Sequence, residues 1–255
     1  MSTLGVVILS LRGMKHLTQS LESVKWADAI TVLHAGAGEP SIGGNYFPSL
    51  RLRKIASLRE LGDPSWEIGT DWVLHLWGEE RVEDELGEEL RALRRRESSQ
   101  VPMGYRIPIR SHLLGRWVKG SLLGPSPALR LSRRVEHLPS GWWDSTTEKS
   151  REAPLLPHGW IGDYAATELN DGIDRLQSVS ELWAEEFRGK DHGLNPKAAV
   201  LRSFQVFVKM LLMNGIVMNG FAGLTLSTLA AYLVLLTGAR AWEASNARTK
   251  IKSVG

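Results

Sequence analysis

The chain has 255 residues, and 43% of them are hydrophobic, which is enough for one large α/β domain or for a domain with an appended element. Its net charge of +3 comes without a basic stripe carrying interleaved aromatic residues, so no nucleic-acid partner is expected. Because the chain contains no cysteine, disulfides, thiolate metal sites and cysteine nucleophiles are excluded.

The first part of the chain alternates between strand and helix patterns. Residues 4–9 form a continuous apolar run that is typical of a strand buried on both faces, and residues 29–33 form a second one. Between them, apolar positions spaced four and then three residues apart predict a helix over 16–24. This strand–helix–strand unit predicts a mostly parallel sheet with a right-handed crossover. Residues 34–40 have the composition of a loop, and residues 40–70 give no clear assignment.

The rest of the chain continues this alternation and then turns helical. Further strands are expected at 72–76, 104–110 and 128–131, and further helices at 83–96 and 168–187. An uncharged run at 216–237 has basic residues on both flanks. Its length can cross a hydrocarbon core of about 30 Å, but a pair of helices buried against the domain explains the same pattern. Membrane association and burial both stay open.

The junction that follows the strand at 72–76 reads Trp77-Gly78-Glu79-Glu80. In an open α/β sheet, ligands bind outside the carboxyl ends of the strands. Carboxylates placed there supply the hard oxygen ligands that divalent cations prefer, so Glu79 and Glu80 are candidate ligands for Mg²⁺ or Mn²⁺. The alternative is that both belong to the acidic first turn of the next helix, where they would complement its positive end.

Several short motifs occur in a consistent order along the chain. Residues 21–28 read Leu-Glu-Ser-Val-Lys-Trp-Ala-Asp, and residues 72–82 read Trp-Val-Leu-His-Leu-Trp-Gly-Glu-Glu-Arg-Val. Weaker matches follow at 129–133, 182–186 and 219–224. Together these motifs resemble the family 2 glycosyltransferases, in particular the group that modifies lipopolysaccharide core, whose corresponding motifs read Leu-x-Ser-Val-x-Trp-Ala-Asp and Trp-Val-Leu-x-Leu-Asp-Ala-Asp-Glu-Arg-Val.

The resemblance implies a single Rossmann-like domain of the GT-A type over residues 1–190, followed by a helical, membrane-associated segment over residues 191–255. It implies a nucleotide sugar at the carboxyl edge of the sheet, generally with a divalent cation, and a lipid-linked glycan as the acceptor. Such an inverting enzyme would work at the cytoplasmic face of the inner membrane. By the family's positions, the donor-binding residues would be His34, Gly36, Glu39 and Arg130, and the catalytic base would be Asp144.

Some of these residues also have a plain structural interpretation. Asp144 would then be a turn or N-cap residue instead of a base for the acceptor hydroxyl. Arg130 would be a solvated charge at a strand edge instead of a phosphate ligand. Gly36 would serve an ordinary turn instead of allowing a phosphate to approach the backbone.

The chain departs from the family at its chemical positions. Trp77 stands where the family has the first Asp of its metal-binding motif, and His34 stands where it has the first Asp of its nucleotide-contacting loop. A nucleotide diphosphate carries charge that a cation or preorganised donors must stabilise, and Trp77 cannot ligate a metal. Two hypotheses follow: a working glycosyltransferase with an altered site, or a catalytically inactive relative that acts as a membrane-associated scaffold or regulatory partner.

Overall fold

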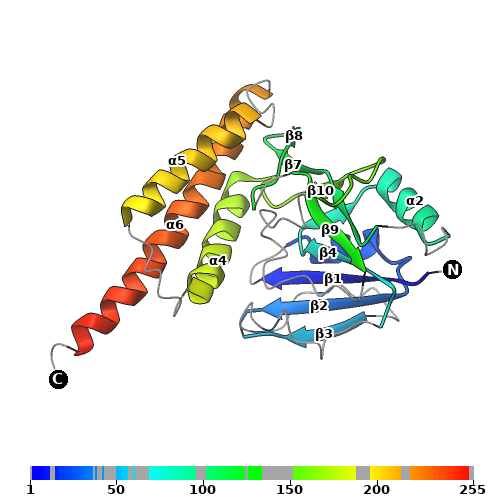
Figure 1. Cartoon of the computed structure of the whole chain (residues 1–255), viewed down its shortest axis with the longest axis horizontal. Coiled ribbons are helices and arrows are strands. Elements are labelled where there is room, and N and C mark those ends of the chain that lie inside the picture. The colour runs from blue at the N-terminus through cyan, green and yellow to red at the C-terminus, as the bar shows by residue number, and fades with distance from the viewer. Residues whose placement is uncertain are drawn as a thin grey trace.

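The computed structural model describes residues 2–11, 15–36, 38, 42, 50–56, 60, 69–95, 102–123, 126–133, 152–187, 196–213 and 219–252. The larger of its two sheets has six strands in the order β3-β2-β1-β4-β9-β6 and lies to one side of α4, α5 and α6 (Figure 1). These strands are β1 (Leu4–Leu11), β2 (Ala29–Ala35), β3 (Leu50–Lys54), β4 (Trp72–Trp77), β6 (Gly104–Ile107) and β9 (Ala128–Arg133). β1, β2, β3 and β4 run parallel, whereas β9 lies antiparallel between β4 and β6. The expected α/β class with a mostly parallel sheet is confirmed.

A second, four-stranded sheet has the order β5-β10-β7-β8. Its strands are β5 (Glu80–Val82), β7 (Ile109–Leu113), β8 (Arg116–Lys119) and β10 (Ile161–Asp163). The single strand expected at 104–110 is wrong, because β6 and β7 belong to different sheets and Pro108 separates them. Proline has no backbone N–H and cannot donate within a ladder, which explains the break at this residue.

The helices are α1 (Leu17–Ser23), α2 (Asp84–Leu93), α4 (Leu169–Phe187), α5 (Pro196–Met213) and α6 (Gly220–Lys252). The helices expected at 16–24, 83–96 and 168–187 are confirmed as α1, α2 and α4. Figure 1 shows β1, β2 and β3 pointing toward α4, with α5 and α6 beyond it. α4, α5 and α6 therefore lie at the carboxyl end of these parallel strands.

β1 separates two hydrophobic cores, because its alternate side chains point to opposite faces of the sheet. Val6 and Ile8 belong to a core that contains buried residues of α1 and α2. Val7 and Leu9 belong to the other core, which contains buried residues of α4, α5 and α6. All four side chains are at most 1% exposed, as expected for a strand covered on both faces.

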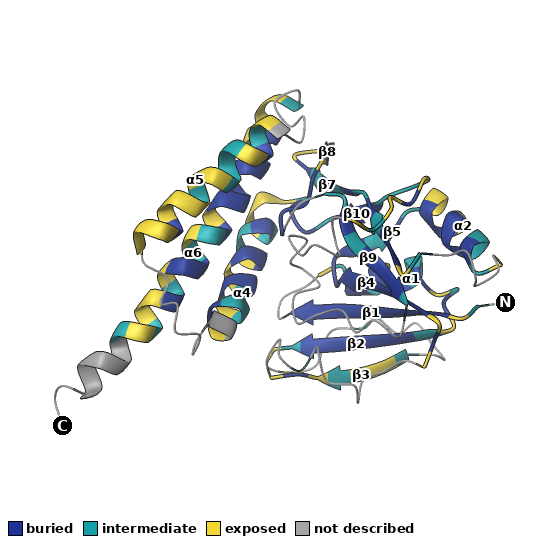
Figure 2. Ribbon diagram, viewed as in Figure 1, coloured by how far each residue is buried: buried dark blue, intermediate teal, exposed yellow. Residues whose placement is uncertain are grey.

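α6 is the helix in the described part of the chain that is long and apolar enough to cross a membrane, over Gly220–Asn246. Its residues Leu226, Leu229 and Leu233 are buried in the core that also contains side chains of β1. Figure 2 shows buried and exposed residues alternating along α6. One side of the helix therefore packs on the protein, as the burial alternative expected, and membrane association stays a prediction.

Candidate functional site

The order of the strands reverses beside β1, because β2 and β3 follow on one side of it and β4 lies on the other. At such a switch point the carboxyl ends of neighbouring parallel strands border the crevice in which α/β proteins bind ligands. β4 ends at Trp77, and Gly78 and Glu79 form the turn that follows. The expected position of Glu79 at the carboxyl end of a strand is confirmed.

Glu79 lies in a buried cluster with Asp163 of β10 and Arg175 of α4. The Nη1 atom of Arg175 lies 2.8 Å from Oδ1 of Asp163 and 3.4 Å from Oε2 of Glu79. Each of these side chains is at most 4% exposed. The guanidinium carbon also lies 5.6 Å from the centre of the Trp77 ring, within cation–π range. Two carboxylates therefore share one guanidinium beside the end of β4.

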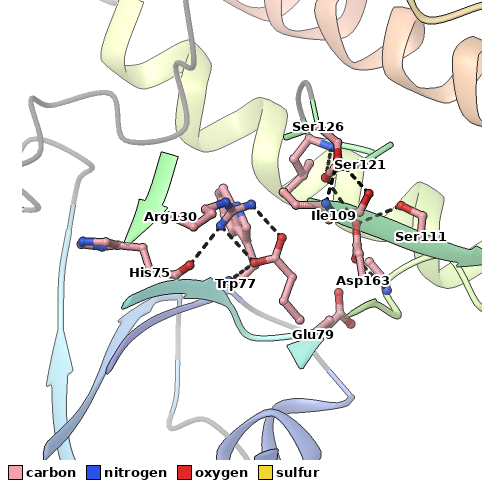
Figure 3. A network of polar contacts seen from close by, with 12 residues as sticks. His75, Trp77, Glu79, Ile109, Ser111, Ser121, Ser126, Arg130 and Asp163 are labelled. Atoms are coloured by element: carbon pink, nitrogen blue, oxygen red, sulfur yellow. Dashed lines mark hydrogen bonds and ion pairs between the residues drawn. The ribbon is translucent and has the colours of Figure 1, made fainter. Parts of the chain in front are cut away.

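Hydrogen bonds fix the Asp163 carboxylate in its orientation. Oδ1 accepts a hydrogen bond from the backbone N–H of Ala165 at 3.1 Å. Oδ2 accepts longer hydrogen bonds from the hydroxyls of Ser111 and Ser121, at 3.3 and 3.5 Å (Figure 3). These hydrogen bonds and the ion pair with Arg175 hold the Asp163 carboxylate in one orientation.

The Glu79 carboxyl is less well satisfied. Burial raises the pKa of Glu79 from its usual value of 4.5 to about 7, although Arg175 acts in the opposite direction. Within the described residues, Oε2 of Glu79 and the Nε and Nη2 atoms of Arg175 have no hydrogen-bond partner. With Glu79 ionised, the three side chains carry one net negative charge, and protonating Glu79 neutralises the cluster. Burial is the main reason for the raised pKa of Glu79, and the Asp163 carboxylate adds to it to a smaller extent.

Glu80 belongs to a separate buried ion pair. Its two oxygens accept hydrogen bonds from Nη1 and Nη2 of Arg130 at 3.0 and 2.8 Å, and Oε2 also accepts one from the Trp77 N–H at 2.8 Å. Arg130 donates a further hydrogen bond to the His75 carbonyl at 3.3 Å (Figure 3). The Glu80 side chain is 0% exposed and that of Arg130 5% exposed. The pair joins β4, β5 and β9 where the two sheets meet.

Two structural alternatives from the sequence are therefore wrong. Arg130 is buried and paired, so it is not a solvated charge at a strand edge. The acidic residues in the first turn of α2 are Asp84 and Glu85, so Glu79 and Glu80 do not belong to that turn.

The expected donor-binding residues lie in different surroundings. His34 is part of β2 and not of a loop, since the strand continues to Ala35. It is 2% exposed, its Nδ1 atom lies 3.3 Å from the Ser10 hydroxyl, and burial lowers its pKa. Gly36 follows the strand and is exposed. Glu39 and the catalytic candidate Asp144 lie outside the residues that the structure describes.

A divalent cation does not fit these carboxylates. Both oxygens of Glu80 accept hydrogen bonds from Arg130, while Glu79 and Asp163 share Arg175. Across the described ranges, no group of three or more His, Asp or Glu side chains could hold a metal ion. The two expected metal ligands thus face two different arginines instead of one common site.

Asp163 and Arg175 were not expected from the sequence. Asp163 ends a strand of three residues, which is too short for a recognisable pattern. Arg175 offers a better signal, because it is next to Leu176 and four residues before Val179 on the buried side of α4. An arginine within the apolar stripe of a helix indicates a buried acidic partner.

No protein-family model and no curated protein matches the sequence, so the function is inferred from the site and from the motifs of the chain.

Proposed function

We propose that this chain is a glycosyltransferase-like protein with a GT-A fold, which transfers a sugar from a nucleotide sugar to a lipid-linked glycan of cell-envelope polysaccharide or lipopolysaccharide core. The observation that carries this proposal is the charged cluster of Glu79, Asp163 and Arg175 at the switch point beside β1 and β4. Nucleotides bind at this place in doubly wound sheets. The motifs at 21–28 and 72–82 support a sugar nucleotide as the ligand.

The second sheet supports the same assignment. β5 begins directly after Glu79, and β10 ends in Asp163, so the small sheet brings a second carboxylate to the end of β4. The backbone N–H of Tyr164 also donates to the Glu79 carbonyl at 3.1 Å. The small sheet therefore lies beside the carboxyl end of β4.

The exposed faces of α5 and α6 support a lipid-linked acceptor and a position at the inner membrane. The exposed large apolar residues are Val200, Leu201, Phe204 and Leu212 on α5, and Phe221, Leu224, Tyr232, Leu235 and Trp242 on α6. α5 also carries Lys197, Arg202 and Lys209 and no acidic residue. A helix with an apolar face and basic residues suits an anionic lipid surface. The proposed docking partner is therefore the anionic cytoplasmic leaflet.

A second candidate function is a catalytically inactive relative that serves as a membrane-associated scaffold or regulatory partner. The specific observation in its favour is that the described carboxylates behind β4 are all engaged by arginines, Glu80 by Arg130 and the other two by Arg175. In a protein that no longer binds a nucleotide, these ion pairs would serve stability alone.

Thermal unfolding with nucleotides separates the two functions. Uridine diphosphate and other nucleoside diphosphates should raise the unfolding temperature, since a ligand at one hundred times its Kd adds about 2.7 kcal/mol. Sugar transfer to a lipid-linked acceptor should be lost in Glu79→Gln. If no nucleoside diphosphate shifts the unfolding temperature, with or without Mn²⁺, the transferase proposal fails and the scaffold is favoured.

A further inference from the structure

The Arg175 guanidinium lies where two carboxylates converge, behind the end of a parallel strand. A single nitrogen, Nη1, contacts oxygens from both Asp163 and Glu79. Glu79 comes from the turn after β4, Asp163 from β10 and the arginine from α4, so three separate parts of the chain meet at this point. One positive charge bridging two carboxylates is also the arrangement that a bound metal cation produces.

The surroundings hold this arrangement in place. Asp163 is fixed by Ala165, Ser111 and Ser121, so one of its oxygens is turned toward Arg175. The arginine side chain is 2% exposed and lies near the Trp77 ring, so water competes little for its charge. The Nε and Nη2 atoms still have no hydrogen-bond partner among the described residues. Both atoms are buried, and guanidinium donors of this kind pair with carboxylate or phosphate oxygens.

We infer that the Arg175 guanidinium takes the place of a divalent cation, and that this chain binds the diphosphate of its nucleotide without a metal. The ligand in this inference rests on the proposed function, whereas the role of Arg175 against the two carboxylates does not. Two observations agree with this inference. Trp77 cannot ligate a metal, and both oxygens of Glu80 are engaged by Arg130. Arginine is permanently charged, so it supplies this positive charge at every physiological pH.

Mn²⁺ binding tests the role of Arg175 without any nucleotide. The purified full chain is titrated with Mn²⁺ alone, and the electron paramagnetic resonance signal of the free ion is followed. The wild type should leave this signal unchanged. Arg175→Ala should deplete it, because Glu79 and Asp163 are then left together without a positive charge. Arg175→Lys is the matched control, since it keeps the charge and should again leave the signal unchanged.

The unfolding temperature keeps this test decisive if Arg175→Ala folds poorly. Mn²⁺ should then raise the unfolding temperature of that variant, or restore its folding, and should not stabilise the wild type. Mn²⁺ binding by the wild type that is lost in Glu79→Gln would overturn the inference. So would an Arg175→Ala protein that neither binds Mn²⁺ nor is stabilised by it.

Nucleotide binding in the presence of a chelator tests the second half of the inference. The wild type should bind uridine diphosphate equally well with EDTA and with Mn²⁺. Binding that requires Mn²⁺ would overturn metal independence and leave the proposed function standing. Failure of every nucleoside diphosphate to bind would instead refute the proposed function and with it metal-free diphosphate binding, while the Mn²⁺ titration would still decide whether Arg175 replaces a cation.

Discussion

Two buried arginines pair in different ways with the carboxylates near the carboxyl end of β4. Arg130 pairs with Glu80 through two hydrogen bonds, so their charges balance. Arg175 faces both Asp163 and Glu79, so one negative charge remains in excess. Burial raises the pKa of Glu80 as well as that of Glu79. We expect the balanced pair to act on stability and the second cluster to respond to cations and ligands.

Removing one partner of the balanced pair should be costly. Arg130→Met leaves the Glu80 carboxyl buried without its counter-ion, and this class of change destabilises proteins by about 3–5 kcal/mol. Urea unfolding measures the loss. The double variant Glu80→Gln with Arg130→Met should recover most of it, because neither position then holds an unpaired charge. A single variant as stable as the wild type would contradict the structural role of the pair.

The raised pKa of Glu79 predicts a pH dependence of stability. With a pKa of about 7, the folded protein keeps the Glu79 proton where the unfolded chain, with a pKa of 4.5, has released it. Stability from this group is therefore greatest below pH 4.5 and falls as the pH rises to about 7. The loss is on the order of 3 kcal/mol over this range. Urea unfolding of Glu79→Gln as a function of pH should lack the part of the decline that Glu79 causes and keep the part caused by Glu80, whose pKa burial also raises.

The same pH series must be compared between the two proteins, because His75 acts in the opposite direction. Burial lowers the pKa of His75 to about 3, so this group favours the folded state increasingly as the pH rises from 3 to 6.5. The difference between wild type and Glu79→Gln removes this contribution, since both proteins contain His75. A difference that stays constant from pH 4.5 to pH 7 would contradict the raised pKa of Glu79.

At the scale of elements, the strands with long apolar runs could be predicted from the sequence. β1, β2 and β4 are buried on both faces, so nearly every residue in them is apolar. β3 was not predicted, because its alternation of Leu and Arg spans only five residues and the strand lies at the edge of the sheet, where no residue is buried. β5 and β10 have three residues each, and such short strands depend on their neighbours for pairing.

The candidate site could likewise be predicted only in part from the sequence. The place of Glu79 could be predicted, because a strand that ends in acidic residues puts them at the carboxyl edge of the sheet. Its partners could not, because Asp163 and Arg175 follow it by more than eighty residues in the sequence. Only the pairing of β10 with β5 and the packing of α4 bring them together. The pairing of Glu80 with Arg130 likewise depends on β9 lying beside β4.

The crossing of α5 and α6 depends on a glycine. A Cβ atom on Gly238 would lie 2.5 Å from the Cβ atom of Ala199, which the α5 backbone holds in place. Gly238→Ala gains up to about 1 kcal/mol of helix propensity but loses about 1–3 kcal/mol by overpacking, so we expect net destabilisation. In an Ala199→Gly background the same substitution should be neutral or stabilising. Urea unfolding of the four proteins checks this reversal, and equal effects in both backgrounds would contradict the close contact.

At the scale of the whole molecule, the candidate site lies at the same end as α4, α5 and α6, and much of the surface of α5 and α6 is exposed. Buried residues of α4, α5 and α6 share a core with β1. Other residues of α5 and α6 are exposed (Figure 2), and several of these are large and apolar. An exposed apolar surface of this kind marks an interaction site more often than a plain protein surface. Its place next to the carboxyl edge of the sheet would bring a lipid-linked acceptor close to the nucleotide.

Binding to vesicles tests this arrangement. The wild type should float with vesicles that contain phosphatidylglycerol and less with vesicles of phosphatidylcholine alone. Phe204, which is 64% exposed on α5, should insert into the lipid, so Phe204→Glu should weaken binding by about tenfold or more. Gln205→Glu adds the same charge at the neighbouring exposed position and should have a smaller effect. Equal effects of the two substitutions, or a wild type that stays unbound, would contradict the docking face.

The place of nucleotide binding can be measured most directly by hydrogen–deuterium exchange of the full chain with and without uridine diphosphate. Amides at the carboxyl ends of β1 and β4, and around Arg175 in α4, should exchange more slowly when the nucleotide is present. Protection confined to other parts of the chain, or no protection at saturating nucleotide, would contradict a nucleotide site at the switch point of this sheet.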